Sequence, residues 1–150
     1  MKLRIFVSAF FILLTASMVG AREVDYLALL AEDSEIKAIA VVSKVQRMSC
    51  NADGTFMRVT FKGKYAVTPY TAKSFVGGCK TMENGWQKRT PGMVYFKPRK
   101  GQTVYVTITT NGGAITSYTP ITTQLDAVIR NHPDRLAYSK GKASVVPRDD

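Results

Sequence analysis

Alternating apolar and polar residues around glycine turns constrain this chain more than any other feature of its sequence. Residues 55–67, TFMRVTFKGKYAV, place Met57, Val59 and Phe61 on one side of an extended strand. Residues 104–120, VYVTITTNGGAITSYTP, alternate in the same way on both sides of a glycine pair. Because successive side chains of a strand point to opposite faces, such segments fit a sheet with one face in a core. The sequence therefore predicts a mainly β protein.

The turn within residues 104–120 sets the register of a hairpin. A two-residue type I′ loop at Asn111-Gly112 places Ile108 opposite Ile115. It also places Tyr105 opposite Tyr118. A loop one residue later would set Ile115 beside a threonine, so we favour the first register. Thr and Tyr are ordinary strand formers that need no ligand, so we expect the other face of this hairpin to meet water. That face carries Tyr105, Thr107, Thr116 and Tyr118.

A second hairpin is predicted ahead of the first segment. Residues 36–50, IKAIAVVSKVQRMSC, place Ile39, Val41 and Val45 on one side of a strand. The sequence NADG that follows is typical of a turn. A further strand is expected at residues 92–96, GMVYF.

Helices are predicted at both ends of the folded chain. Residues 22–35 place apolar residues on one helical face among acidic ones. Residues 121–132 form a helix that begins at a threonine cap and ends before Pro133. Residues 68–92 are rich in glycine and proline, so we expect a long connection held by a cysteine or by a short helix. Residues 139–150 have little to pack and are expected to form a flexible tail.

The first 21 residues have the pattern of a secretory signal peptide. Lys2 and Arg4 precede an apolar run at residues 5–19, and small residues at 19–21 offer a cleavage site. The run is shorter than the roughly 18 residues that a membrane-spanning helix needs. We therefore expect an exported protein, located in the periplasm or outside the cell.

Two cysteines, Cys50 and Cys79, would meet an oxidising compartment after export. Their even number allows one intrachain pair. A redox motif would need the two thiols close in sequence, and a metal site would need more ligands than the chain offers. A disulfide between the two is therefore expected.

The order of these segments is similar to that of a known fold. A long strand containing IAVVSKV, a hairpin into GTFMRVTF and a later strand GQTVYVTI, with helices outside, resemble a small Greek-key barrel of the OB type. Among secreted proteins, the chain resembles the tissue inhibitors of metalloproteinases and the netrin-type domains over about residues 36–120. The resemblance implies one OB-like barrel domain within residues 22–138. Those inhibitors begin with a Cys-x-Cys that reaches a metal, whereas this chain would begin Arg22-Glu23-Val24, so no inhibitory residue carries over.

The residue content argues against catalysis. The single histidine, His132, stands at the end of the predicted C-terminal helix, where a basic group suits the helix dipole. Neither a nucleophile elbow nor a zinc-protease spacing accompanies it, and no glycine-rich segment has the spacing of a phosphate-binding loop. We therefore expect no enzyme activity, no cofactor and no metal site.

Positive charge is the remaining feature that indicates a function. The chain has 21 Lys and Arg against 11 Asp and Glu, and only Lys2 and Arg4 fall in the predicted signal peptide, which leaves a net charge of +8. Residues 86–100 mix basic and aromatic side chains without an acidic one, which suits a polyanion or an acidic sugar. The alternatives are a solvated basic surface and, for Trp86 and Phe96, a place in the core. The candidate binding residues are Trp86, Lys88, Arg89, Tyr95, Lys97, Arg99 and Lys100.

We therefore expect a non-enzymatic binding module with a basic surface. Its partner would be an anionic glycan, a lipid surface or an envelope protein. Two alternatives stay open: an inhibitor or accessory protein of a secreted enzyme, and single-stranded nucleic-acid binding, which basic and aromatic residues on an OB-type barrel also suit. Export makes nucleic acid the less favoured partner.

Overall fold

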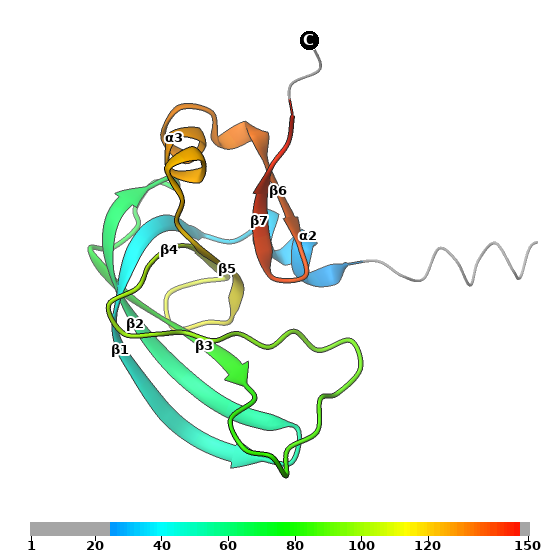
Figure 1. The fold of residues 1–150 in the computed structure, drawn as a ribbon. Helices are drawn as coiled ribbons and strands as arrows, with labels where there is room; N and C mark the ends of the chain where they lie inside the picture. The colour runs from blue at the N-terminus through cyan, green and yellow to red at the C-terminus, as the bar shows by residue number, and fades with distance from the viewer. Residues whose placement is uncertain (1–24, 148–150) are drawn as a thin grey trace, which may run out of the picture.

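The structure, a computed structural model, describes residues 25–147 and confirms a mainly β protein (Figure 1). A five-stranded antiparallel sheet has the strand order β3-β2-β1-β4-β5, and β6 and β7 form a second, two-stranded sheet. The large sheet contains β1 (Ile36–Asn51), β2 (Gly54–Ala66), β3 (Ser74–Thr81), β4 (Thr103–Ile108) and β5 (Ile115–Pro120). The remaining elements are α2 (Tyr26–Glu32), α3 (Thr123–Asn131), the 3-10 helix η1 (Pro133–Arg135), β6 (Leu136–Ser139) and β7 (Lys142–Val145).

The central strand β1 is long enough to curl the sheet. It pairs with β2 along almost its whole length, which confirms the predicted turn after residue 51, and with β4 only over Ile36–Val41. Three register shifts interrupt the β1–β2 ladder. Such shifts increase the local twist of a strand pair. Figure 1 shows β1 and β2 bending together as a result.

Apolar side chains gather on both faces of this sheet. The main core lies inside the curl, where the rings of Phe61 and Phe75 stack at 5.5 Å between centroids. A second core lies between the other face and the C-terminal elements. The sequence predicts Ile39, Val41 and Val45 on one side of β1, but Ile39 belongs to the second core while Val45 packs against the main one. The register shift between Val42 and Lys44 explains the difference, because the extra residue in β1 moves the following side chains of that strand to the other face.

The connection expected at residues 68–92 contains a strand that the sequence pattern does not reveal. In β3, Phe75 and Cys79 point into the main core, with Gly77 between them. A Cβ atom on Gly77 would lie 2.6 Å from Cγ1 of Ile115, so only glycine lets β3 approach β5 this closely. Gly77 therefore allows the strand to form, and it also interrupts the hydrophobic alternation by which the strand could be recognised in the sequence.

The free edge of β3 meets the loop between β4 and β5. The amide of Gly78 donates to the carbonyl of Gly113 (2.9 Å), and the amide of Gly112 donates to the carbonyl of Val76 (2.8 Å). Gly78 and Ala114 form a single parallel bridge. Within residues 25–147 the contact is one bridge long, so the structure shows a curled sheet and not a continuous closed barrel.

The β4–β5 hairpin keeps only part of its predicted register. Ile108 faces Ile115 as expected, but a shift after Thr107 places Val106 opposite Tyr118. The prediction that Tyr118 points outward is therefore wrong, and its ring belongs to the main core. The turn also differs from type I′, since Gly112 has a positive φ of 89° while the residue before it does not.

The face of the hairpin predicted to meet water is buried. Tyr105, Thr107 and Thr116 are all fully shielded from solvent. Thr107 Oγ1 lies 2.7 Å from Thr116 Oγ1 and 2.6 Å from Ser117 Oγ, so the hydroxyls hydrogen-bond to one another. Helices and the β6–β7 hairpin cover this face, and so does the connection between α2 and β1, where Ser34 Oγ lies 2.8 Å from Thr116 Oγ1. Alternation alone could not predict this cover, because it comes from distant parts of the chain.

The expected disulfide is absent: Cys50 is an exposed free thiol and Cys79 a buried one. Cys50 pairs with Thr55 of β2, whereas Cys79 of β3 pairs with Met57 of β2. Two strand spacings separate the cysteines, which is about 9.5 Å across the sheet. A disulfide requires Cα atoms within about 7 Å.

Both predicted helices are present, but a strand occupies part of the segment predicted to be a flexible tail. In α3, Thr122 caps the N-terminus by accepting from the amide of Leu125 (3.1 Å), as expected. The flexible tail expected from residue 139 instead contains β7, whose Ala143 packs in the second core. The predicted signal peptide, residues 1–21, lies outside the described residues. Neither helix within residues 25–147 is long and apolar enough to cross a membrane.

Candidate anion-binding site

All seven predicted binding residues lie on one segment, residues 82–102, which connects β3 to β4. This connection contains no helix or strand, so the prediction of a strand at residues 92–96 is wrong. Most of the seven side chains are exposed, including Trp86 at 59%, which excludes the core alternative for that residue. Phe96, by contrast, is 8% exposed and packs in the main core.

Polar contacts hold the first half of the connection to the β1–β2 turn. The buried side chain of Gln87 donates from Nε2 to Oγ1 of Thr55 (2.9 Å) and to the carbonyl of Asn51 (3.0 Å). Its Oε1 accepts from the amides of Glu83 (3.0 Å) and Asn84 (3.1 Å). A buried polar side chain with this many partners fixes the local path of the chain.

Tyr95 also holds the connection to the β1–β2 turn. Its hydroxyl donates to the carbonyl of Asp53 (2.6 Å) and accepts from the amide of Thr90 (2.9 Å). The guanidinium of Arg89 lies over the ring, 5.2 Å from its centroid. Because Tyr95 is engaged at both its hydroxyl and its face, its contacts are structural, and the ring is not an open platform for a ligand.

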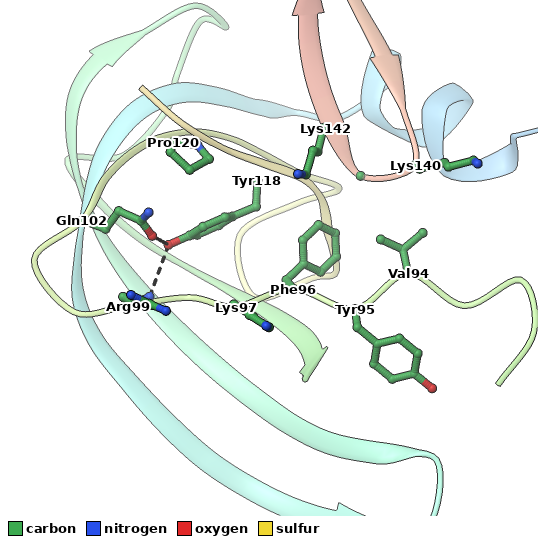
Figure 2. Close-up of a pocket in the computed structure, with 11 residues that line it drawn as sticks. Val94, Tyr95, Phe96, Lys97, Arg99, Gln102, Tyr118, Pro120, Lys140 and Lys142 are labelled. Carbon is green, nitrogen blue, oxygen red and sulfur yellow. Dashed lines mark hydrogen bonds between the residues drawn. The ribbon is translucent and has the colours of Figure 1, made fainter. Parts of the chain in front are cut away.

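The second half of the connection forms one wall of a pocket of about 430 Å³ (Figure 2). Phe96 is fixed there by its amide, which donates to the carbonyl of Lys80 (2.9 Å), and by edge contact with the ring of Tyr118. Lys97 and Arg99 line the pocket from this wall. Their side chains are exposed next to a buried aromatic floor.

The opposite wall comes from the β6–β7 turn. Lys140 and Gly141 both have positive φ, 50° and 78°, as in the two-residue type I′ loop that joins hairpin strands. A Cβ on Gly141 would lie 2.7 Å from the ring of Phe96, so the turn lies directly against the pocket floor. The carbonyl of Gly141 also accepts from the amide of Tyr118 (2.9 Å). This placement brings Lys140 and Lys142 to the pocket.

Four cationic side chains therefore line one pocket, and no acidic side chain lines it: Lys97, Arg99, Lys140 and Lys142. In the described part of the chain, the salt bridges join other pairs, Arg47–Glu83, Lys80–Asp53 and Arg130–Asp126. Figure 2 shows Lys97 and Arg99 along the connection and Lys140 and Lys142 on the hairpin beside it. The lining of the pocket thus carries four positive charges and no negative one.

Two polar groups lie between these cations. The hydroxyl of Tyr118 donates to Oε1 of Gln102 (2.6 Å), and the amide of Arg99 approaches the same hydroxyl at 3.4 Å (Figure 2). Burial raises the pKa of Tyr118, so its phenol stays neutral and adds no negative charge to the pocket. The chemistry of the site is that of an anion receptor with hydrogen-bonding groups on its floor.

The structure brings together only part of the predicted site. Tyr95, Lys97 and Arg99 line the pocket, and the other four predicted residues do not. The sequence reasoning missed Lys140, Lys142, Gln102 and Tyr118. A Lys-Gly-Lys turn is visible in the sequence, but it falls in the segment predicted to be a tail.

Within residues 25–147, no three His, Cys, Asp or Glu side chains are grouped so that they could hold a metal ion. Comparison with protein-family models, with curated proteins and with solved structures finds no match to this chain.

Proposed function

We propose that this protein is a non-enzymatic anion-binding module and that the anion binds in the pocket described above. The observation that carries the proposal is that Lys97, Arg99, Lys140 and Lys142 all belong to the lining of one pocket, without an acidic residue among them. Like charges held around one pocket repel one another, and a bound anion relieves that repulsion. The protein is expected to be exported, on the strength of the predicted signal peptide.

The backbone at Lys140 supports this proposal. A side chain other than glycine at positive φ costs about 1 to 3 kcal/mol, and Asn adopts this region more readily than Lys. Lys140 nevertheless occupies it, at φ 50°. A lysine at this position places a charge at the pocket and makes the turn less favourable, as expected where function and stability compete.

We also infer the finer fold, an OB-like Greek-key barrel that is partly open. The strand order β3-β2-β1-β4-β5 and the parallel bridge between Gly78 and Ala114 support it, because they bring the two edges of the sheet together. In this arrangement Phe96 of the 82–102 connection packs in the main core, and the connection forms the pocket together with the β6–β7 turn.

A soluble sulfated polysaccharide, labelled for fluorescence anisotropy, tests the proposed function. The pocket variant combines Lys97→Gln, Arg99→Gln, Lys140→Asn and Lys142→Gln. The matched control combines Arg58→Gln, Lys62→Gln, Lys64→Gln and Lys73→Gln, four exposed residues that do not line the pocket. Each variant loses one arginine, three lysines and four positive charges.

The pocket variant should bind about tenfold or more weakly than the control, because each lost ion pair contributes up to about 1 kcal/mol. Binding by the unaltered protein should weaken as salt rises to physiological strength, where the screening length falls to about 8 Å. Equal loss of affinity in both variants would show attraction by net charge alone and would overturn the assignment of the pocket.

A further inference from the structure

The candidate pocket continues into a second hollow that reaches α2. The two hollows share Val94, Tyr95 and Lys140. Tyr26 and Leu27 of α2 line the far side of the second hollow, which encloses about 790 Å³. The helix α2, the connection and the β6–β7 turn therefore form one continuous surface, and Figure 1 shows α2 beside that turn.

Helix α2 presents apolar side chains outward as well as inward. Leu27 packs against the main core, and Ala31, one turn later, is fully buried. On the outer side lie three residues at helical spacing, which we call the α2 stripe: Tyr26, Leu29 and Leu30. They are 70%, 52% and 49% exposed. A surface helix normally carries polar residues on its outer side.

One acidic residue ties this helix to the cationic pocket. Asp25 caps α2, since its Oδ1 accepts from the amide of Ala28 (3.0 Å). Its Oδ2 accepts from the amide of Lys140 (2.8 Å). The carboxylate is therefore engaged by two backbone donors. It holds the α2 stripe and the β6–β7 turn in one arrangement.

We propose that the pocket and the α2 stripe together form a docking surface for a bilayer that contains anionic phospholipids. This inference rests on the proposed function, since it names the source of the anion. The four pocket cations contact headgroup phosphates, while the α2 stripe enters the boundary between headgroups and acyl chains. Apolar side chains beside clustered Lys and Arg are the combination that favours an interface over either water or hydrocarbon.

The α2 stripe is what selects a membrane over a soluble polyanion. A sulfated glycan satisfies the cations but leaves Tyr26, Leu29 and Leu30 in water. A bilayer surface offers phosphates to the cations and apolar volume to the stripe, and Asp25 fixes α2 relative to the β6–β7 turn. Each basic side chain near an anionic surface should raise partitioning about fivefold, and burial of the two leucines should add about tenfold or more.

Co-sedimentation with vesicles tests this inference. The chain is used as isolated from the cells that produce it, with its N-terminus read from intact mass, so that all variants share the same N-terminal residues. Vesicles of phosphatidylglycerol mixed with phosphatidylcholine are compared with vesicles of phosphatidylcholine alone. The stripe variant is Leu29→Ser with Leu30→Ser. Its control is Met48→Ser with Val146→Ser, which are 50% and 45% exposed and line neither hollow.

The stripe variant should bind the anionic vesicles about tenfold or more weakly than its control, while its affinity for the soluble sulfated polysaccharide stays unchanged. Tyr26→Trp in a Trp86→Phe background should shift its fluorescence to the blue on binding, since residue 26 leaves water. Vesicle binding unaffected by the stripe variant, or no such shift, would overturn the membrane inference. Polysaccharide binding by the pocket would survive either result. Loss of polysaccharide binding in the control of the pocket variant as well would instead overturn the proposed function.

Discussion

Gly77→Ala tests whether the edge strand β3 packs against β5 as the structure shows. The new Cβ would lie 2.6 Å from Cγ1 of Ile115 and 3.0 Å from Cδ1 of Ile108, both in the main core. Over-packing of this kind costs about 1 to 3 kcal/mol. Ala in place of Gly returns about 0.5 to 1 kcal/mol of backbone entropy. The midpoints of these two ranges leave an expected net loss of about 1 kcal/mol of unfolding free energy, and the upper limit is about 2.5 kcal/mol.

Thermal unfolding followed by circular dichroism measures this loss. For an ordered domain of this size, each kcal/mol shifts Tm by roughly 3 to 5 °C, so Gly77→Ala should lower Tm by about 3 to 5 °C. Ile115→Ala removes the crowded Cγ1 atom and costs about 2 to 5 kcal/mol by itself. The double variant should lose less unfolding free energy than the sum of the two single losses, since Ile115→Ala removes the atom that the new Cβ would crowd.

Gly85→Ala is the matched control for this experiment. A Cβ on Gly85 meets no atom within 4 Å, and its φ is not in the left-handed region. This change should therefore leave Tm unchanged or slightly higher. If Gly77→Ala is equally harmless, or if the two core substitutions add without coupling, β3 does not pack on β5 and the OB-like closure is wrong.

Three further predictions concern the thiols, the buried hydroxyls and the β6–β7 turn. In the native protein, only the exposed Cys50 should react with an alkylating reagent, because Cys79 is buried and burial raises its pKa to about 12. If neither thiol reacts after the protein is unfolded without reductant, the two cysteines form a disulfide. The same raised pKa means that the unfolded chain releases this proton first, so Tm should fall as pH rises above about 9. Thr107→Asp should destabilise the domain by several kcal/mol, as should Ile108→Asp, because either carboxylate would be buried away from water; a tolerated Thr107→Asp would contradict the covered face. Lys140→Asn should keep or raise Tm while polysaccharide affinity falls, and a drop in Tm would refute the strained-turn argument.

The sequence predicts the elements whose patterns are local. The β1–β2 hairpin follows from alternation around a turn, and α3 follows from a threonine cap, spaced apolar residues and a proline after its end. Ile108 faces Ile115 as predicted, because that pair lies next to the turn. In each case the residues that determine the structure lie within a few positions of one another.

The predictions that were wrong share a different cause, which is contact between segments far apart in the sequence. Strand β3 packs against β5 because Gly77 has no side chain and leaves space for Ile115. A residue without a side chain adds nothing to a hydrophobic pattern, so the sequence does not reveal this strand. The shift after Thr107 places Tyr118 in the main core, and the hydroxyls of Thr107 and Ser117 are buried under elements far along the chain. The disulfide prediction used the number of cysteines and the expected oxidising compartment. Neither shows the strand order, which separates Cys50 from Cys79.

The pocket shows why a basic run in the sequence is a poor guide to a basic site in space. Of the five cations in residues 86–100, Lys97 and Arg99 reach the pocket, and Arg89 is engaged with the ring of Tyr95 instead. The other half of the site comes from a turn some forty residues later, placed there because Gly141 lets the backbone lie on Phe96. Charge along the chain thus indicates that an anion is a sensible partner, but the site itself depends on the close contact of Gly141 with Phe96. A substitution at Gly141 should therefore abolish anion binding while leaving every positive charge in the chain, which net charge alone cannot explain.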